Sequence, residues 1–117
     1  MKDKSVNDMS QHVLVVEDYA DLRAVVVSAL SSEHYRCDEV ANSDDAIAML
    51  RSHHYGTVLL STRMPIADDP VVQYLLAEDA NHQTKVILMA DPDQQTDDYA
   101  ALTKPFGLEQ LFARMKM

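Results

Sequence analysis

The chain has 117 residues and a formal net charge of −9, a length that suits one compact domain with a hydrophobic core and is too short for two. A domain this acidic would repel a phosphate backbone, so direct binding to DNA or RNA is not expected. No apolar run approaches the roughly 20 residues that a membrane-spanning helix needs. Cys37 is the only cysteine, which excludes an internal disulfide and a zinc site built on several cysteines.

The first ten residues are polar and lack the hydrophobic segment of a signal peptide. We therefore expect a mobile polar N-terminal segment over residues 1–10, a single domain over residues 11–117, and a cytoplasmic location.

The first half of that domain alternates strands and helices. Residues 12–18 form an apolar run that ends in two acids, which predicts a buried strand. Residues 20–33 have helical spacing of their apolar side chains, and residues 36–41 alternate loosely like an edge strand. A second helix is predicted over residues 42–54, with Ser43 as its N-cap and two aspartates in its first turn. The predicted apolar side of the first helix consists of Leu22, Val25, Val26, Ala29 and Leu30.

The second half continues the same alternation. Residues 56–61 predict a third strand, and Pro70 is well placed to start a helix that continues over residues 71–81. Residues 84–90 predict a fourth strand, and residues 107–116 a closing helix. The predicted apolar face of that helix consists of Leu108, Leu111, Phe112 and Met115.

One connection is too short for this rhythm. The 14 residues from Ala90 to Thr103 cannot hold a helix of about 11 residues, a strand of about 5 and the loops between them. Residues 91–98 are acidic and nearly devoid of apolar side chains, so we expect an irregular loop or one helical turn. A short fifth strand then follows over residues 99–103. The order predicts an α/β fold, a doubly wound five-stranded parallel sheet with its fourth helix shortened or missing.

Candidate functional residues follow the strands. In an open parallel sheet, function gathers beyond the carboxyl ends of the strands. Glu17 and Asp18 end the first strand, Ser61 ends the third, and Lys104 ends the fifth. Crowded carboxylates at such a place could hold a hard divalent cation such as magnesium. The alternative is that the two acids pair with Lys104 and cap the next helix.

Four motifs in this order carry a family resemblance: "VLVVED", "VLLSTRMP", "VILMA" and "LTKPF". Residues 11–116, which contain them, resemble a response regulator receiver (CheY-like) domain, the phosphorylation module of two-component signalling. The resemblance implies the flavodoxin-like strand order 2-1-3-4-5, in agreement with the architecture predicted from the residues.

The resemblance also implies roles for the residues at the strand ends. In the family, an aspartate ending the third strand accepts a phosphoryl group, an acid pair helps it to bind magnesium, and a lysine contacts the phosphoryl oxygens. Glu17 and Asp18 match the acid pair, Lys104 matches the lysine, and the backbone carbonyl of Arg63 matches a metal ligand. Ser61, however, occupies the position of the phosphoacceptor.

Two more positions depart from the family pattern. Met89 occupies the place of a switch hydroxyl, and Ala101 that of a switch aromatic, although Tyr99 is close enough to leave this register open. The segment over residues 91–98 replaces a helix that the family uses to report phosphorylation. The phosphoacceptor position, the two switch positions and the reporting surface therefore all differ from the family pattern.

The physical consequence is a pocket that needs neither metal nor phosphate. A serine hydroxyl stays protonated at neutral pH, so Ser61 is a poor nucleophile without a general base and a weak magnesium ligand. With two acids and one lysine, the pocket is nearly neutral by itself. We expect weak or no magnesium binding, no other cofactor, and a salt bridge from Lys104 to Glu17 or Asp18. Met89 should fill the channel that a hydroxyl would cross.

The expected function is that of a pseudo-receiver, a protein-interaction module that works without phosphorylation and is not an enzyme. Expected partners are a histidine kinase, an output or scaffold protein, or another receiver, homodimers included. Because no output domain is visible, the chain should act in trans, by dimerising, or as a piece of a longer protein. Two alternatives remain open. One is a phosphoacceptor at Asp68 or Asp91, which distance from Lys104 disfavours; the other is a small ligand in the vacated pocket.

Overall fold

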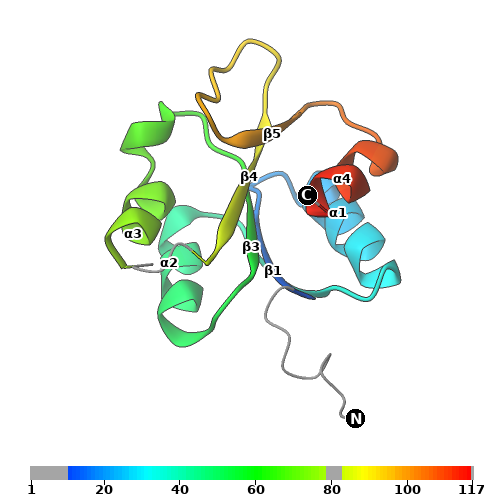
Figure 1. Ribbon diagram of the computed structural model, residues 1–117, viewed down its shortest axis with the longest axis horizontal. Helices are drawn as coiled ribbons and strands as arrows, with labels where there is room; N and C mark the ends of the chain where they lie inside the picture. Colours follow the sequence, from blue (N-terminus) through cyan, green and yellow to red (C-terminus); the bar gives the residue numbers. More distant parts are fainter. Residues whose placement is uncertain (1–10, 79–82, 117) are drawn as a thin grey trace.

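Five short strands form one parallel sheet in the order β2-β1-β3-β4-β5 (Figure 1). The strands are β1 (His12–Val16), β2 (Arg36–Val40), β3 (Thr57–Leu60), β4 (Lys85–Ala90) and β5 (Ala100–Thr103). This confirms the predicted order 2-1-3-4-5. The structure is a computed structural model that describes residues 11–78 and 83–116. The segment predicted to be mobile, residues 1–10, lies outside the described residues.

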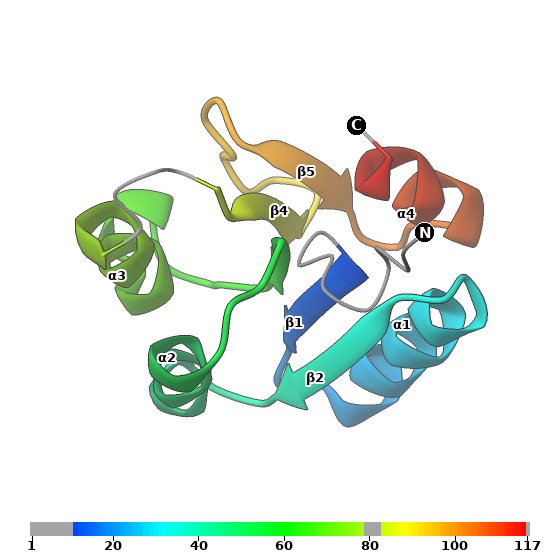
Figure 2. The ribbon, with the colours of Figure 1, turned by 60° about the horizontal axis from the view of Figure 1, so that its bottom comes forward.

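Helices pack on both faces of the sheet (Figures 1 and 2). One face carries α1 (Ala20–Ser32) and α4 (Leu108–Met115), and the other carries α2 (Ser43–Ser52) and α3 (Pro70–Glu78). A short 3-10 turn, η3 (Ile66–Asp68), precedes α3. The first residue of α3 is proline, as predicted, because the fixed φ of proline suits the first helical position. No helix among the described residues is long and apolar enough to span a membrane.

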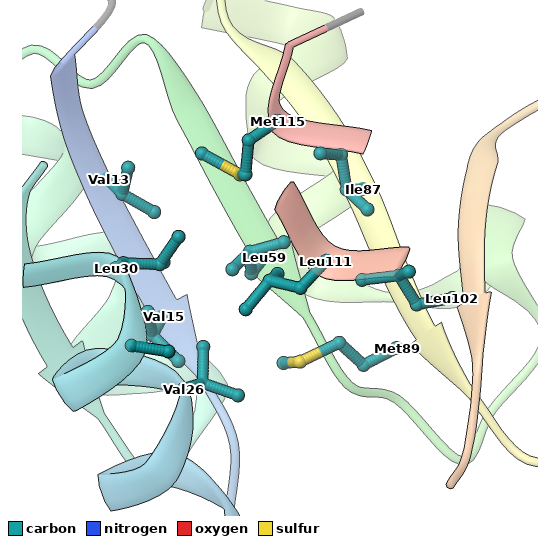
Figure 3. Packing of buried hydrophobic residues seen from close by; sticks show 11 residues of the cluster. Val13, Val15, Val26, Leu30, Leu59, Ile87, Met89, Leu102, Leu111 and Met115 are labelled. Atoms are coloured by element: carbon teal, nitrogen blue, oxygen red, sulfur yellow. The ribbon is translucent and has the colours of Figure 1, made fainter. Parts of the chain in front are cut away.

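The sheet separates two hydrophobic cores, and successive residues of a strand point into different ones. Val13 and Val15 of β1 pack on the α1–α4 side, whereas Leu14 and Val16 pack on the α2–α3 side. Burial on both faces explains why β1 and β3 read as continuous apolar runs rather than alternating ones. Figure 3 shows the α1–α4 core, where Leu59 of β3 lies between residues contributed by β1, β4 and the two helices.

Three local predictions were wrong. Val25 is 54% exposed and Leu108 is 47% exposed, because α1 and α4 bury narrower stripes than the spacing suggested. Leu108 is the first residue of α4, so no preceding helical turn shields it. Asn42, and not Ser43, caps α2; its Oδ1 accepts a hydrogen bond from the Asp45 backbone N–H at 2.8 Å.

The connection between β4 and β5 confirms the expected irregularity. Residues 91–99 contain turns and no helix, and β5 then pairs in parallel with β4. In Figure 1 this connection is the yellow loop that rises above the sheet. The parallel strands β4 and β5 are therefore connected without a helix, unlike the other neighbouring strands in the sequence.

A hydrogen-bonded cluster around Asp38 of β2 supports a pH prediction. Tyr55 is 3% exposed, and its hydroxyl donates to Asp38 Oδ2 at 2.6 Å; His12 Nε2 lies 3.1 Å from the same oxygen. Burial alone would raise the pKa of Asp38, but the hydrogen bonds from Tyr55 and His12 outweigh it and lower the pKa. Because the pKa of Asp38 is lower in the folded state, the ionised carboxylate stabilises the fold at pH values above the unfolded-state pKa of about 3.9. This stabilisation is lost as the pH falls through the folded-state pKa.

Tyr55→Phe is therefore expected to lower the free energy of unfolding by about 1.5 kcal/mol at pH 7, the range of a hydrogen bond to a charged group. The difference between the variant and the parent protein should shrink as pH falls below 4. Asp38 then takes up a proton, and the parent protein loses the stabilisation that the variant already lacks. Urea unfolding at stepwise pH measures both effects, with Tyr74→Phe as a control whose deficit does not vary in this window. If the loss of unfolding free energy in Tyr55→Phe did not depend on pH, it would come from altered packing of the ring and not from the hydrogen bond to Asp38.

Candidate functional site

The carboxyl ends of β1, β3 and β5 bring Glu17, Ser61 and Lys104 together. Glu17 is only 1% exposed. Its Oε1 accepts a hydrogen bond from Ser61 Oγ at 2.5 Å and lies 3.0 Å from Lys104 Nζ. Its Oε2 accepts from the backbone N–H of Tyr19 at 3.0 Å. Both oxygens of this buried carboxylate therefore have donors from the chain itself.

Backbone hydrogen bonds that continue beyond the strands hold these three residues in place. The Glu17 N–H donates to the Val40 carbonyl oxygen at 3.1 Å, and the Ser61 N–H donates to the Val16 carbonyl oxygen at 2.9 Å. The Lys104 N–H donates to the carbonyl oxygen of the last β4 residue at 2.7 Å. Each side chain thus starts from the rigid edge of the sheet, and only the lysine needs its long stem to reach the others.

Asp18 has a partner of its own. Arg63 Nη1 donates to Asp18 Oδ2 at 2.6 Å, and this hydrogen bond lowers the pKa of the Asp18 carboxyl. The same contact raises the pKa of Arg63. The side chains are 48% and 78% exposed, so water and salt screen the pair. Sequence reasoning considered only the backbone carbonyl of Arg63 and missed this role of its guanidinium.

A cavity of about 230 Å³ opens above the cluster. Glu17, Asp18, Ser61 and Lys104 all line it, and so does Asp91, which follows β4. The inference that Asp91 lies far from Lys104 was wrong, because the carboxyl ends of neighbouring parallel strands meet at one edge. Asp68, in η3, does not line this cavity.

Gln94 joins the β4–β5 connection to this edge of the sheet. Its Nε2 donates to the Thr62 carbonyl oxygen at 2.7 Å, and its Oε1 accepts from the Asp91 N–H at 3.2 Å. Sequence reasoning missed Gln94, since nothing in an irregular polar segment indicates which side chain will reach another loop. The connection is therefore fixed at the wall of the cavity.

The remaining two predicted site residues lie on opposite sides of the sheet. Met89 is 1% exposed and packs in the α1–α4 core near Val26 and Leu111 (Figure 3), while it also lines the cavity. Ala101 pairs with Leu88 in the sheet and packs on the α2–α3 side. Tyr99 precedes β5 and packs on that same side.

Comparison with known families decides the identity of the fold. The model of the response regulator receiver domain matches residues 13–116. The chain belongs to this family. Receivers are signalling modules of two-component systems rather than typical enzymes, and this receiver has the five-stranded CheY-like architecture that the family shares.

Curated relatives of this receiver are transcriptional regulators. It is 32% identical over 114 residues to the transcriptional regulatory protein PmrA of Pectobacterium parmentieri, with 89% of this chain and 50% of the relative covered. It is 33% identical over 113 residues to TcrA of Mycobacterium tuberculosis (strain ATCC 25618 / H37Rv), with 89% and 44% covered. The receiver spans about half the length of these relatives.

Solved structures confirm the fold of the receiver. One is the receiver domain of a sensor histidine kinase of Pseudomonas aeruginosa with a magnesium ion coordinated in its active-site cleft; its TM-score is 0.77 at 23% identity, with 91% of this chain and 94% of that chain covered. Another is a CheY-like receiver domain of Methylobacillus flagellatus, with a TM-score of 0.76 at 21% identity and coverage of 91% and 96%.

Proposed function

We propose that this receiver is a pseudo-receiver, a protein-interaction module that works without phosphorylation of its third-strand residue. One observation carries the proposal. Ser61, at the position that the family resemblance gives to the phosphoacceptor, donates its hydroxyl hydrogen to the buried Glu17, which Lys104 also contacts. Glu17, Ser61 and Lys104 thus form a hydrogen-bonded set of one acid, one hydroxyl and one cation in a cavity that Asp18 and Asp91 also line.

The chemistry of Ser61 disfavours transfer of a phosphoryl group to it. A serine hydroxyl attacks only when a base takes its proton, and Glu17 is the acceptor within reach. If Glu17 took that proton, Lys104 would lose its carboxylate partner inside the fold. The product would also be a phosphate ester, which lacks the lability of an acyl phosphate and would not reverse quickly.

The residues present do not fit a magnesium ion well. Magnesium prefers near-octahedral oxygen ligands with one or two carboxylates. The two oxygens of Glu17 already have donors, and Asp18 is bonded to the Arg63 guanidinium. No cluster of three potential metal-ligating side chains occurs within residues 11–78 and 83–116. We therefore propose that magnesium binds weakly or not at all, and that the module needs no cofactor.

Partners of the proposed module are proteins. The relatives are transcriptional regulators that are about twice as long as this chain, and receivers interact with histidine kinases and other proteins. A histidine kinase, an output or scaffold protein, or another receiver, a second copy included, would fit. The net charge of −9 argues against nucleic acid as the direct ligand.

Incubation with acetyl phosphate and magnesium, followed by intact mass measurement, tests the proposal. We expect no added phosphate, because no aspartate stands where Ser61 does. Ser61→Ala is the matched control for the site. An acid-stable, base-labile phosphate that Ser61→Ala removes, or a hydroxylamine-labile one in the parent protein, would overturn the proposal. In the second case Asp91, which lines the same cavity as Lys104, is the candidate acceptor, and Asp91→Asn should abolish the signal.

A further inference from the structure

The sheet has one incompletely covered face. Parallel sheets are normally buried on both faces by helices, and β5 packs against α4 on one side. On the α2–α3 side, the chain passes from β4 to β5 through residues 91–99 without a helix, and Figures 1 and 2 show no described helix over β5 there. Val86, Tyr99 and Ala101 point to this side and are only half-buried.

Helix α3 contributes an apolar side chain to the same region. On α3, Tyr74 faces α2, because its ring lies 5.9 Å from the guanidinium carbon of Arg51. Leu75 faces the core. At about 100° per residue, Leu76 lies on the flank of α3 opposite Tyr74, towards β4 and β5, and it is 61% exposed. Leu76, Val86, Tyr99 and Ala101 together define what we call the open face.

Negative charge borders the open face. No lysine, arginine or histidine occurs between Lys85 and Lys104. The intervening segment carries four exposed aspartates, and within the described residues none of them lies within 4.0 Å of a cationic side chain. They are Asp91, Asp93, Asp97 and Asp98. A partner for this face must therefore bring positive charge at its rim as well as apolar side chains at its centre.

The acidic border is held in position before any partner arrives. Gln94 ties it to the Thr62 carbonyl oxygen and to the Asp91 N–H, and the Tyr99 N–H donates to the Thr96 carbonyl oxygen at 3.0 Å. Binding therefore does not have to order this segment, and the smaller entropy cost favours affinity.

We propose that the open face docks a basic amphipathic helix of a protein partner, which occupies the place of the absent helix between β4 and β5. This names the partner of the interaction module and to that extent rests on the proposed function. A six-residue strand such as β4 spans about 20 Å, the length of a helix of about 13 residues. The apolar side of the helix covers Val86 and Ala101, and its basic side faces the aspartates. A second copy of this acidic chain is disfavoured at this face by like charge.

The probe is a terminally capped peptide of about 15 residues with leucines on one helical face and lysines on the other, a length that covers the β4 span. Its binding to the intact chain is followed by backbone amide shifts in NMR titrations. We expect the shifts to concentrate in residues 83–103 and α3, and the dissociation constant to rise with salt. A glutamate-for-lysine peptide with the same leucines is the charge control and should bind at least about tenfold more weakly.

Two matched receiver variants localise the effect. Ala101→Arg places bulk and like charge on the open face and should weaken binding about tenfold. Val25→Arg adds the same side chain at an exposed apolar position on the other side of the sheet and should leave binding unchanged. Shifts on α1 and α4, equal weakening by both variants, no binding, or dimerisation through the open face would each overturn the proposal. Phosphate uptake from acetyl phosphate would overturn the pseudo-receiver and leave this docking result standing, so the two failures are distinguishable.

Discussion

Lys104→Met is expected to lower the free energy of unfolding by about 3 kcal/mol, at the low end of the cost of removing one partner of a buried ion pair. Glu17 is 1% exposed, whereas the Lys104 side chain is 25% exposed, so some solvent screening reduces the cost. Without the ammonium, the carboxylate keeps the Ser61 hydroxyl and the Tyr19 N–H but loses the one cationic side chain that lies within 4.0 Å of it among the described residues. Denaturant unfolding at pH 7 measures the change.

A control and a double variant make this result specific. Arg63→Met removes the cation of the exposed Arg63–Asp18 pair and should leave the unfolding free energy within experimental error, because water screens that pair. Adding Glu17→Gln to Lys104→Met should recover most of the loss, since a neutral amide no longer needs a cation. If Lys104→Met lowered the free energy of unfolding no more than Arg63→Met does, the Glu17–Lys104 contact would contribute little to stability.

The fold was predictable because long-range order in this chain follows local patterns. Continuous apolar runs indicated strands that are buried on both faces, and their alternation with helices indicated a parallel sheet. The shortage of residues between Ala90 and Thr103 was enough to predict a fourth helix that is shortened or missing, and the structure has no helix over residues 91–99. The errors at Val25, Leu108 and Ser43 concern how helices are rotated and capped, which depends on the packing surface and not on periodicity.

The candidate site was predictable only as far as strand ends determine it. Glu17, Ser61 and Lys104 each follow a strand directly, so the topology alone brings them together. Gln94 and the guanidinium of Arg63 reach the site through loop conformation, for which the sequence has no periodic signal. The sequence also left open which acid Lys104 contacts, and burial of Glu17 beside Ser61 favours that acid over the exposed Asp18.

Ser61→Asp should make the stability of this receiver depend on magnesium. The substitution adds a carboxylate beside the buried Glu17, with Lys104 as the shared cation, so like-charge repulsion should lower the free energy of unfolding without metal by about 2 kcal/mol. A third carboxylate is also the hard oxygen ligand that magnesium prefers. Magnesium at about 100 times its dissociation constant should then restore about 2.7 kcal/mol.

Thermal unfolding with and without magnesium at constant ionic strength measures this dependence. The parent protein should not respond, since both oxygens of Glu17 and the Asp18 carboxylate already have donors. Ser61→Asn, which has the shape of the aspartate without its charge, should not respond either, and this separates charge from size. A parent protein stabilised by magnesium as strongly as Ser61→Asp would show that two acids suffice for the metal, and the pseudo-receiver proposal would lose its electrostatic basis. A response confined to Ser61→Asp would instead place the loss of metal binding at this one side chain, because Met89 and the absent helix are unchanged in that variant.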